Sequence, residues 1–277
     1  FYGTQLKEVD IPNSVETIGE AAFRESPIEK LTLNEGITTI GASAFRSTKL
    51  SKVDIPNSVE TIDIGAFYKV DTLTNATIGN GVKQIGVAAF ANTKLSKVDI
   101  PNSVNIIGRS AFSISALEKL TLNEGITTIG DHAFYGTQLK EVDIPNSVET
   151  ICKDAFSSSP LESVTIGNGV KQIGDYAFQE TKIKDLVIPP SVETIGEAAF
   201  STSPIEKLTL NEGITTIGDY AFLETKIKDL VIPHSVETIG EGAFMRIENL
   251  KKIIIGKGIK KISDRAFAFN DNLTDIT

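Results

Sequence analysis

The chain contains very little of several residue types that carry chemistry. Among its 277 residues there are no Trp, one Met, one Cys and two His. A single cysteine, Cys152, excludes an intrachain disulfide and a cysteine-based metal cluster. The histidines, His132 and His234, stand where related segments hold Tyr or Pro, whereas a catalytic triad or a His-based metal site needs two or three converging groups. We therefore expect no catalytic residue, no metal and no cofactor.

Two further absences narrow the possible partners. The chain has no apolar run of about 18 residues, which is the minimum for a membrane-spanning helix. Its formal net charge of −9 provides no overall basic surface, and nucleic-acid binding relies on Lys and Arg that neutralise phosphates. We expect neither membrane insertion nor a nucleic-acid partner. Cations do gather near the end, where they fit either an acidic glycan or an ordinary solvated surface: Lys251, Lys252, Lys257, Lys260, Lys261 and Arg265.

The chain has an internal repeat instead. The dipeptide Ala-Phe recurs at steps of 22 or 23 residues, and a fixed period of this length is typical of a solenoid. The repeated phenylalanines are Phe23, Phe45, Phe67, Phe90, Phe112, Phe134, Phe156, Phe178, Phe200, Phe222, Phe244 and Phe267. Two kinds of unit alternate, so the full period is a pair of 44 residues such as Phe23 to Phe67. We expect buried rings that form one structural core column.

No change of composition interrupts the repeat. We therefore expect residues 1–277 to form a single solenoid domain of about 12 coils. Phe1 falls in the middle of a unit and segment 1–18 is identical to segment 134–151. The chain is on this basis expected to be a fragment, with further repeats or domains of the same protein at both ends.

Each unit contains an alternating segment followed by a returning segment. In the first unit Val9 and Ile11 alternate with polar neighbours, a period of two that predicts a short strand with one buried face. Stacked units would pair these strands in parallel. The returning side is predicted to hold a second extended segment at 16–18 and one helical or 3₁₀ turn at 20–23, because an acidic residue such as Glu20 suits the start of a helical turn.

The unit Leu-x-x-Leu-x-Leu-Pro/Asn-x-x-Val-x-x-Ile-Gly-x-x-Ala-Phe resembles the BspA-like leucine-rich repeat, also called the Treponema-type repeat, along the whole chain. The resemblance implies a right-handed, mainly β leucine-rich-repeat solenoid with a concave parallel sheet. It also implies a non-enzymatic protein, secreted or on the cell surface of a host-associated bacterium, that acts in adhesion or protein binding. Where family units often carry Cys three residues after the Phe, this chain has Ser or Thr, as at Ser26 and Thr48. We expect these hydroxyls to satisfy a backbone group at the corner.

The exposed centre of each predicted strand offers the best candidate binding surface. Its third position alternates between Asp and Thr for eight units, and Asp then gives way to Val and Ile. The candidate residues are Asp10, Asp54, Asp99, Asp143, Val187, Val231 and Ile254. Exposed apolar residues often mark contact surfaces, so we hypothesise a partner-binding strip at Val187, Val231 and Ile254. Two alternatives stay open: an appended segment covers the strip, or Val simply suits a strand.

The leading expectation is a non-enzymatic repeat scaffold that binds a protein or glycan ligand outside the cell. The alternative is a structural spacer or filament without a specific ligand. The near-identity of the units favours the spacer, because a binding surface usually diverges from coil to coil. The change from Asp to Val favours the binder. Cys152 replaces the Gly of Ile-Gly, a position that accepts Asp63 elsewhere, so we expect a partly exposed thiol there.

Overall fold

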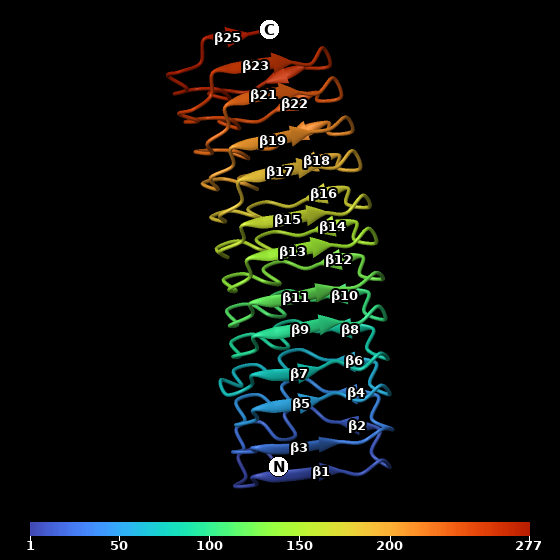
Figure 1. Cartoon of the computed structure of the whole chain (residues 1–277). Coiled ribbons are helices and arrows are strands. Elements are labelled where there is room, and N and C mark those ends of the chain that lie inside the picture. The colour runs from blue at the N-terminus through green and yellow to red at the C-terminus, as the bar shows by residue number, and fades with distance from the viewer. The chain divides into compact units, whose positions relative to one another are not determined.

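A computed structural model describes residues 1–277, which form two compact units, Phe1–Leu139 (unit 1) and Lys140–Thr277 (unit 2). Each unit is a parallel β-solenoid, and the whole chain contains about 12 turns and no helix. Every coil has one long strand of three or four residues and one two-residue strand, on opposite sides of the coil (Figure 1). The expectation of a single folding domain stays a prediction.

In unit 1 the long strands are β1 (Glu8–Ile11), β3 (Lys30–Leu33), β5 (Lys52–Asp54), β7 (Asn75–Thr77), β9 (Lys97–Ile100) and β11 (Lys119–Leu122). Its short strands are β2 (Thr17–Ile18), β4 (Thr39–Ile40), β6 (Thr61–Ile62), β8 (Gln84–Ile85), β10 (Ile106–Ile107) and β12 (Thr128–Ile129). In unit 2 the long strands are β13 (Glu141–Ile144), β15 (Ser163–Ile166), β17 (Asp185–Ile188), β19 (Lys207–Leu210), β21 (Asp229–Ile232) and β23 (Lys252–Ile255). The other strands of unit 2 are β14 (Thr150–Ile151), β16 (Gln172–Ile173), β18 (Thr194–Ile195), β20 (Thr216–Ile217), β22 (Thr238–Ile239), β24 (Lys261–Ile262) and β25 (Asp275–Ile276).

The short strands form the more continuous ladder. Within each unit every short strand pairs in parallel with the next, so that Thr39 lies in register with Thr17 and Thr216 with Thr194. The long strands pair fully only inside the 44-residue pairs, as in β1 with β3 and β17 with β19. Their sheets are interrupted between β3 and β5, between β15 and β17, and between β19 and β21. The strand after each interruption is followed by Pro56, Pro189 or Pro233, which has no N–H to extend the ladder.

The returning side contains a chain of turns, and the expected helical or 3₁₀ turn is wrong. The N–H of Phe23 donates to the Ala44 carbonyl of the next coil at 2.8 Å, whereas the N–H of Ala22 donates to Gly19 at 3.2 Å. An α-helix needs every N–H for its own i−4 carbonyl. Here bonds between coils take alternate N–H groups. Ala21, with φ 51°, also has the left-handed backbone that ends a helix.

The phenylalanine column forms the centre of each core, as the repeat predicted. From Phe1 to Phe134 in unit 1 each ring stacks on the next, with centroids 5.1–5.5 Å apart. From Phe156 to Phe267 in unit 2 the separations are 5.2–5.5 Å. Burial of an aromatic side chain contributes roughly 1.5–3 kcal/mol, so a column of such rings supplies much of the stability.

The small hydroxyls after each Phe have the expected role. Thr48 is fully buried and its Oγ1 donates to the Phe45 carbonyl at 2.9 Å. Thr137 makes the same bond to Phe134 at 3.0 Å. A buried carbonyl that lacks a partner costs about 1–3 kcal/mol, so these hydroxyl bonds contribute to the stability of the corner.

Truncation of one buried ring should destabilise the fold strongly. We expect Phe178→Ala to lower the free energy of unfolding by roughly 3–5 kcal/mol, because the lost contacts leave a cavity in a column that cannot collapse around it. Urea denaturation followed by circular dichroism measures this change. The matched control is Phe1→Ala, whose ring is 72% exposed and whose loss should cost much less. Equal losses in the two variants would contradict a buried-column core.

Candidate functional site

The exposed face of the long strands follows directly from their period of two. In β17 Leu186 and Ile188 are buried at 1% and 0% exposure, whereas Val187 between them is 57% exposed. The first and third residues of each long strand therefore point away from the core. We call the surface that they form the long-strand face.

All seven candidate residues lie on the long-strand face. Asp10, Asp54 and Asp99 occupy the third positions of β1, β5 and β9 in unit 1. In unit 2 the third positions of β13, β17, β21 and β23 are Asp143, Val187, Val231 and Ile254. Their exposure agrees with the sequence pattern, but their role in binding stays a prediction.

The three apolar residues form what we call the apolar strip of unit 2. Val231 and Ile254 are 53% and 40% exposed and lie directly opposite each other in the β21–β23 pair. Val187 is in register with Thr209 of β19, so one Thr lies on the strand between Val187 and Val231. Exposed apolar residues that lie close together often mark contact surfaces, and Val231 and Ile254 are adjacent in this way.

Charged residues of both signs border the apolar strip. The first residues of the same strands place Asp185 opposite Lys207 and Asp229 opposite Lys252. Lys252 also forms an ion pair with Asp275 at 3.3 Å. Exposed pairs of this kind contribute at most about 1 kcal/mol to stability. The strip thus has an apolar centre with a rim whose charges compensate each other.

The aspartates of unit 1 have specific partners on neighbouring coils. Asn34 Nδ2 donates to Asp10 at 3.0 Å, and Asn123 Nδ2 donates to Asp99 at 2.9 Å. Asp54 pairs with Lys52 Nζ at 2.7 Å and accepts a hydrogen bond from Thr77 Oγ1 at 3.0 Å. A Lys–Asp ion pair is therefore present in β5, and an Asn–Asp pair occurs where the next coil supplies Asn.

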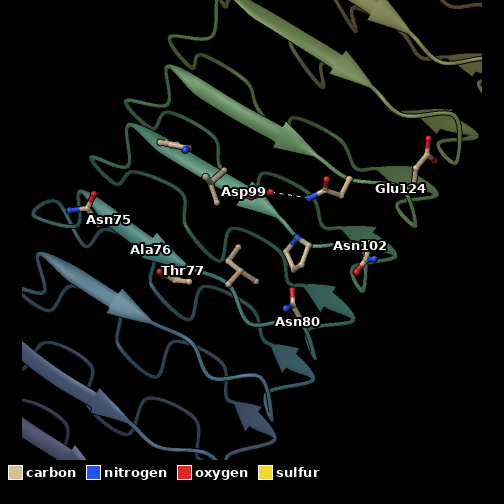
Figure 2. A pocket seen from close by; sticks show the side chains of 12 residues that line it. Asn75, Ala76, Thr77, Asn80, Asp99, Asn102 and Glu124 are labelled. Atoms are coloured by element: carbon tan, nitrogen blue, oxygen red, sulfur yellow. Dashed lines mark hydrogen bonds between the residues drawn. The ribbon is translucent and has the colours of Figure 1, made fainter.

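A hollow of about 910 Å³ lies on the long-strand face of unit 1 between β7 and β9. Figure 2 shows Asn75, Ala76 and Thr77 on one side and Asp99 on the other, with Asn80 and Asn102 at the following corners. The two strands share a single registered pair, Asn75 with Lys97, whereas β9 and β11 share four.

Two substitutions within the repeat line this hollow. Ala76 is the smallest residue at the inward position of any long strand, where the neighbouring coils carry Val53 and Val98. Asn75 stands where those coils carry Lys52 and Lys97. The side chains of Asn75 and Ala76 are smaller than Lys and Val, and they leave more open space beside β7. The column of inward residues contains this signal, but we did not identify it from the sequence.

Neither histidine belongs to a converging set of catalytic groups. His132 lies in unit 1 and stacks edge-on against Tyr135, and His234 lies in unit 2, where its Nδ1 accepts the Lys257 N–H at 3.0 Å. No group of three or more His, Cys, Asp or Glu side chains could hold a metal ion. Cys152 is half-buried, in agreement with the expected partial exposure. The structure contains no helix that is both long and apolar enough to span a bilayer.

Stacked coils with a Leu-x-Leu strand, a turn-rich return and one exposed strand face define a leucine-rich-repeat solenoid. The chain belongs to the BspA type leucine-rich-repeat region family, whose six-copy model matches residues 1–118, 105–224 and 171–277. No protein of curated function matches the sequence.

Solved structures share the fold at low identity. A leucine-rich repeat protein from Bacteroides ovatus superposes with a TM-score of 0.62 at 23% identity, over 97% of this chain and 86% of that one. The pneumococcal vaccine antigen PcpA gives a TM-score of 0.57 at 22% identity, over 98% of this chain and 67% of that one. At such identities the likeness establishes the fold alone.

The environment of Asp54 predicts a pH effect. The hydrogen bond from Lys52, and then that from Thr77, hold the pKa of the Asp54 carboxyl below its ordinary value, although partial burial opposes them. A lowered folded-state pKa means that Asp54 stabilises the fold above the ordinary Asp pKa, and that this contribution is lost as the pH falls through the lowered pKa. The effect on stability should be small, because both side chains are largely exposed.

NMR titration of the Asp54 carboxyl carbon measures this pKa directly. We expect Lys52→Gln to raise it toward the ordinary value and Lys30→Gln, on the preceding long strand, to leave it unchanged. A pKa that does not respond to Lys52→Gln would show that the ion pair is absent in solution.

Proposed function

We propose that this chain is the repeat scaffold of a secreted or surface-exposed bacterial protein, and that it binds a protein partner through the long-strand face. The observation that carries this proposal is the apolar strip of unit 2. Val187, Val231 and Ile254 remain 40–57% exposed although the same position holds Asp or Thr in the other coils. A protein partner with an apolar centre and a polar rim matches such a surface.

Family membership and one structural neighbour support the location outside the cell. Leucine-rich-repeat domains generally mediate protein interactions and are generally non-enzymatic. The neighbour PcpA is a vaccine antigen, and an antigen that antibodies reach must be accessible on the bacterium. We propose the same location for this chain, within a protein that carries further repeats or domains. A glycan ligand is the alternative partner for the strip.

Charge introduced into the apolar strip should abolish partner binding. We expect the double variant Val187→Asp/Val231→Asp to lose binding by more than about tenfold, because two buried, unpaired carboxylates would oppose the contact. Biolayer interferometry against immobilised host matrix proteins (fibronectin, fibrinogen, laminin and collagen) provides the measurement. Both valines are exposed, so the free energy of unfolding should change by only about 0.5 kcal/mol per site.

The matched control is Thr32→Asp, which adds a carboxylate at the same position of β3 in unit 1. It should leave binding unchanged and lower the free energy of unfolding only slightly, because Asp10 lies directly opposite the new carboxylate. Binding by the folded double variant at wild-type affinity would exclude the apolar strip as the contact surface. Loss of binding in Thr32→Asp alone would instead assign the contact to unit 1.

The spacer remains a second candidate function because the coils are so alike. Segment 1–18 repeats without change at 134–151. Negative-stain electron microscopy of the full-length protein distinguishes the two functions. We expect single particles for a binding scaffold, whereas end-to-end polymers would favour the filament.

A further inference from the structure

The hollow between β7 and β9 is a departure from the repeat, independent of the apolar strip. It lies wholly within unit 1, and its volume of about 910 Å³ is within the roughly 300–1,000 Å³ of small-molecule sites. We propose that this hollow is a saccharide-binding groove that takes a short segment of a neutral, polyhydroxylated glycan. This proposal and the proposed function both place ligand binding on the long-strand face, and they share no other assumption.

The polar lining consists mainly of amides. Four asparagines line the groove, at positions 75, 80, 102 and 123, together with Thr77 and Asp99. A side-chain amide offers two donors and one acceptor oxygen, and a sugar hydroxyl is itself both donor and acceptor. Such a lining can both donate hydrogen bonds to the hydroxyls of a sugar ring and accept hydrogen bonds from them. A hydrocarbon ligand would leave the same groups without partners, at a cost of about 1–3 kcal/mol each.

Part of the lining is held in place before any ligand binds. Asn123 Nδ2 donates both to Asp99 Oδ1 and to the Ile100 carbonyl, each at 2.9 Å. Its two donor hydrogens are therefore used, and its Oδ1 is left to accept from a ligand hydroxyl. The dashed bond in Figure 2 shows how this contact fixes Asp99 at the edge of the groove. A preorganised carboxylate–amide pair reduces the entropy cost of binding.

The charges of the lining argue for a neutral ligand. Lys97 and Asp99 are first and third residues of the same strand, so they lie on the same face and compensate each other. Glu124 adds one more carboxylate to the lining, which disfavours an anionic ligand. Nothing in the lining forms a concentrated positive site for a sulfated or phosphorylated ligand. The other wall residues include Ala76, Ile78, Val98 and Pro101. Ile78, Val98 and Pro101 are buried, so the half-buried Ala76 is the wall side chain that offers apolar surface to the C–H groups of a sugar ring.

Restoration of the repeat in β7 tests the groove. The double variant Asn75→Lys/Ala76→Val gives β7 the residues that β5 has at Lys52 and Val53 and β9 at Lys97 and Val98. Because neighbouring coils fold with these residues, the variant should fold with an unchanged or higher melting temperature. The hollow should be filled. We expect affinity for a neutral oligosaccharide to fall by at least about tenfold.

The ligand probes are maltotetraose, cellotetraose and triacetylchitotriose, titrated to about 10 mM into the 15N-labelled chain, since weak saccharide binding lies near a Kd of about 1 mM. We expect at least one of them to shift the amide signals of β7 and β9. Asp99→Ala should weaken that binding. Asp10→Ala is the matched control. Asp10 lies on β1, outside the groove, and accepts a hydrogen bond from Asn34 as Asp99 does from Asn123.

Three outcomes would overturn the proposal. They are the absence of shifts with all three oligosaccharides, undiminished binding in the folded Asn75→Lys/Ala76→Val variant, and binding of a sulfated glycan or a peptide but of no neutral sugar. Each is distinguishable from failure of the proposed function, because Val187→Asp/Val231→Asp lies in unit 2. That variant should leave the saccharide shifts of β7 and β9 unchanged.

Discussion

Stacking of each residue on its own counterpart is the constraint on which the structure depends. Within each unit a residue of one coil lies in register with the residue about one period later, as Thr194 does with Thr216. An inward side chain must therefore fit a copy of itself on both sides. Phe satisfies this condition through offset parallel rings, and Ile and Val satisfy it in the strands. The inward columns consequently vary little, whereas the outward columns are free to change.

The periodic features of the fold could be predicted from the sequence because they repeat. The period of two around Val9 and Ile11 indicated the long strand and its exposed third position, and the Ala-Phe column indicated the buried rings. The Ser or Thr three residues after each Phe was expected to satisfy a backbone group at the corner, as Thr48 does at the Phe45 carbonyl. Each of these features depends on local pattern alone, and each appears about 12 times, so that accidental matches are averaged out.

The predictions that failed concern features that depend on contacts between coils. The acidic residue after Gly19 favours a helix start when a segment is considered by itself, but the N–H of Phe23 is taken by the next coil. The long-strand ladder was expected to be continuous, but it is interrupted between β3 and β5, between β15 and β17, and between β19 and β21. The period of two within one segment does not show how far neighbouring strands pair. The hollow above β7 likewise results from Ala76 only in comparison with Val53 and Val98 on either side. A single segment does not contain that information.

Recognition in such a molecule requires an exception to the repeat. A ligand that contacts identical coils meets the same side chains at every step, so no single position along the stack is preferred. Two of the departures from the repeat in the long strands bear on recognition: Asp gives way to Val in unit 2, and Lys-Val gives way to Asn-Ala in β7 of unit 1. The first adds exposed apolar area without altering the backbone, and the second removes volume. A stacked fold tolerates both changes, since neither disturbs the phenylalanine column, and the positions that vary are therefore those where binding can be specific at little cost in stability.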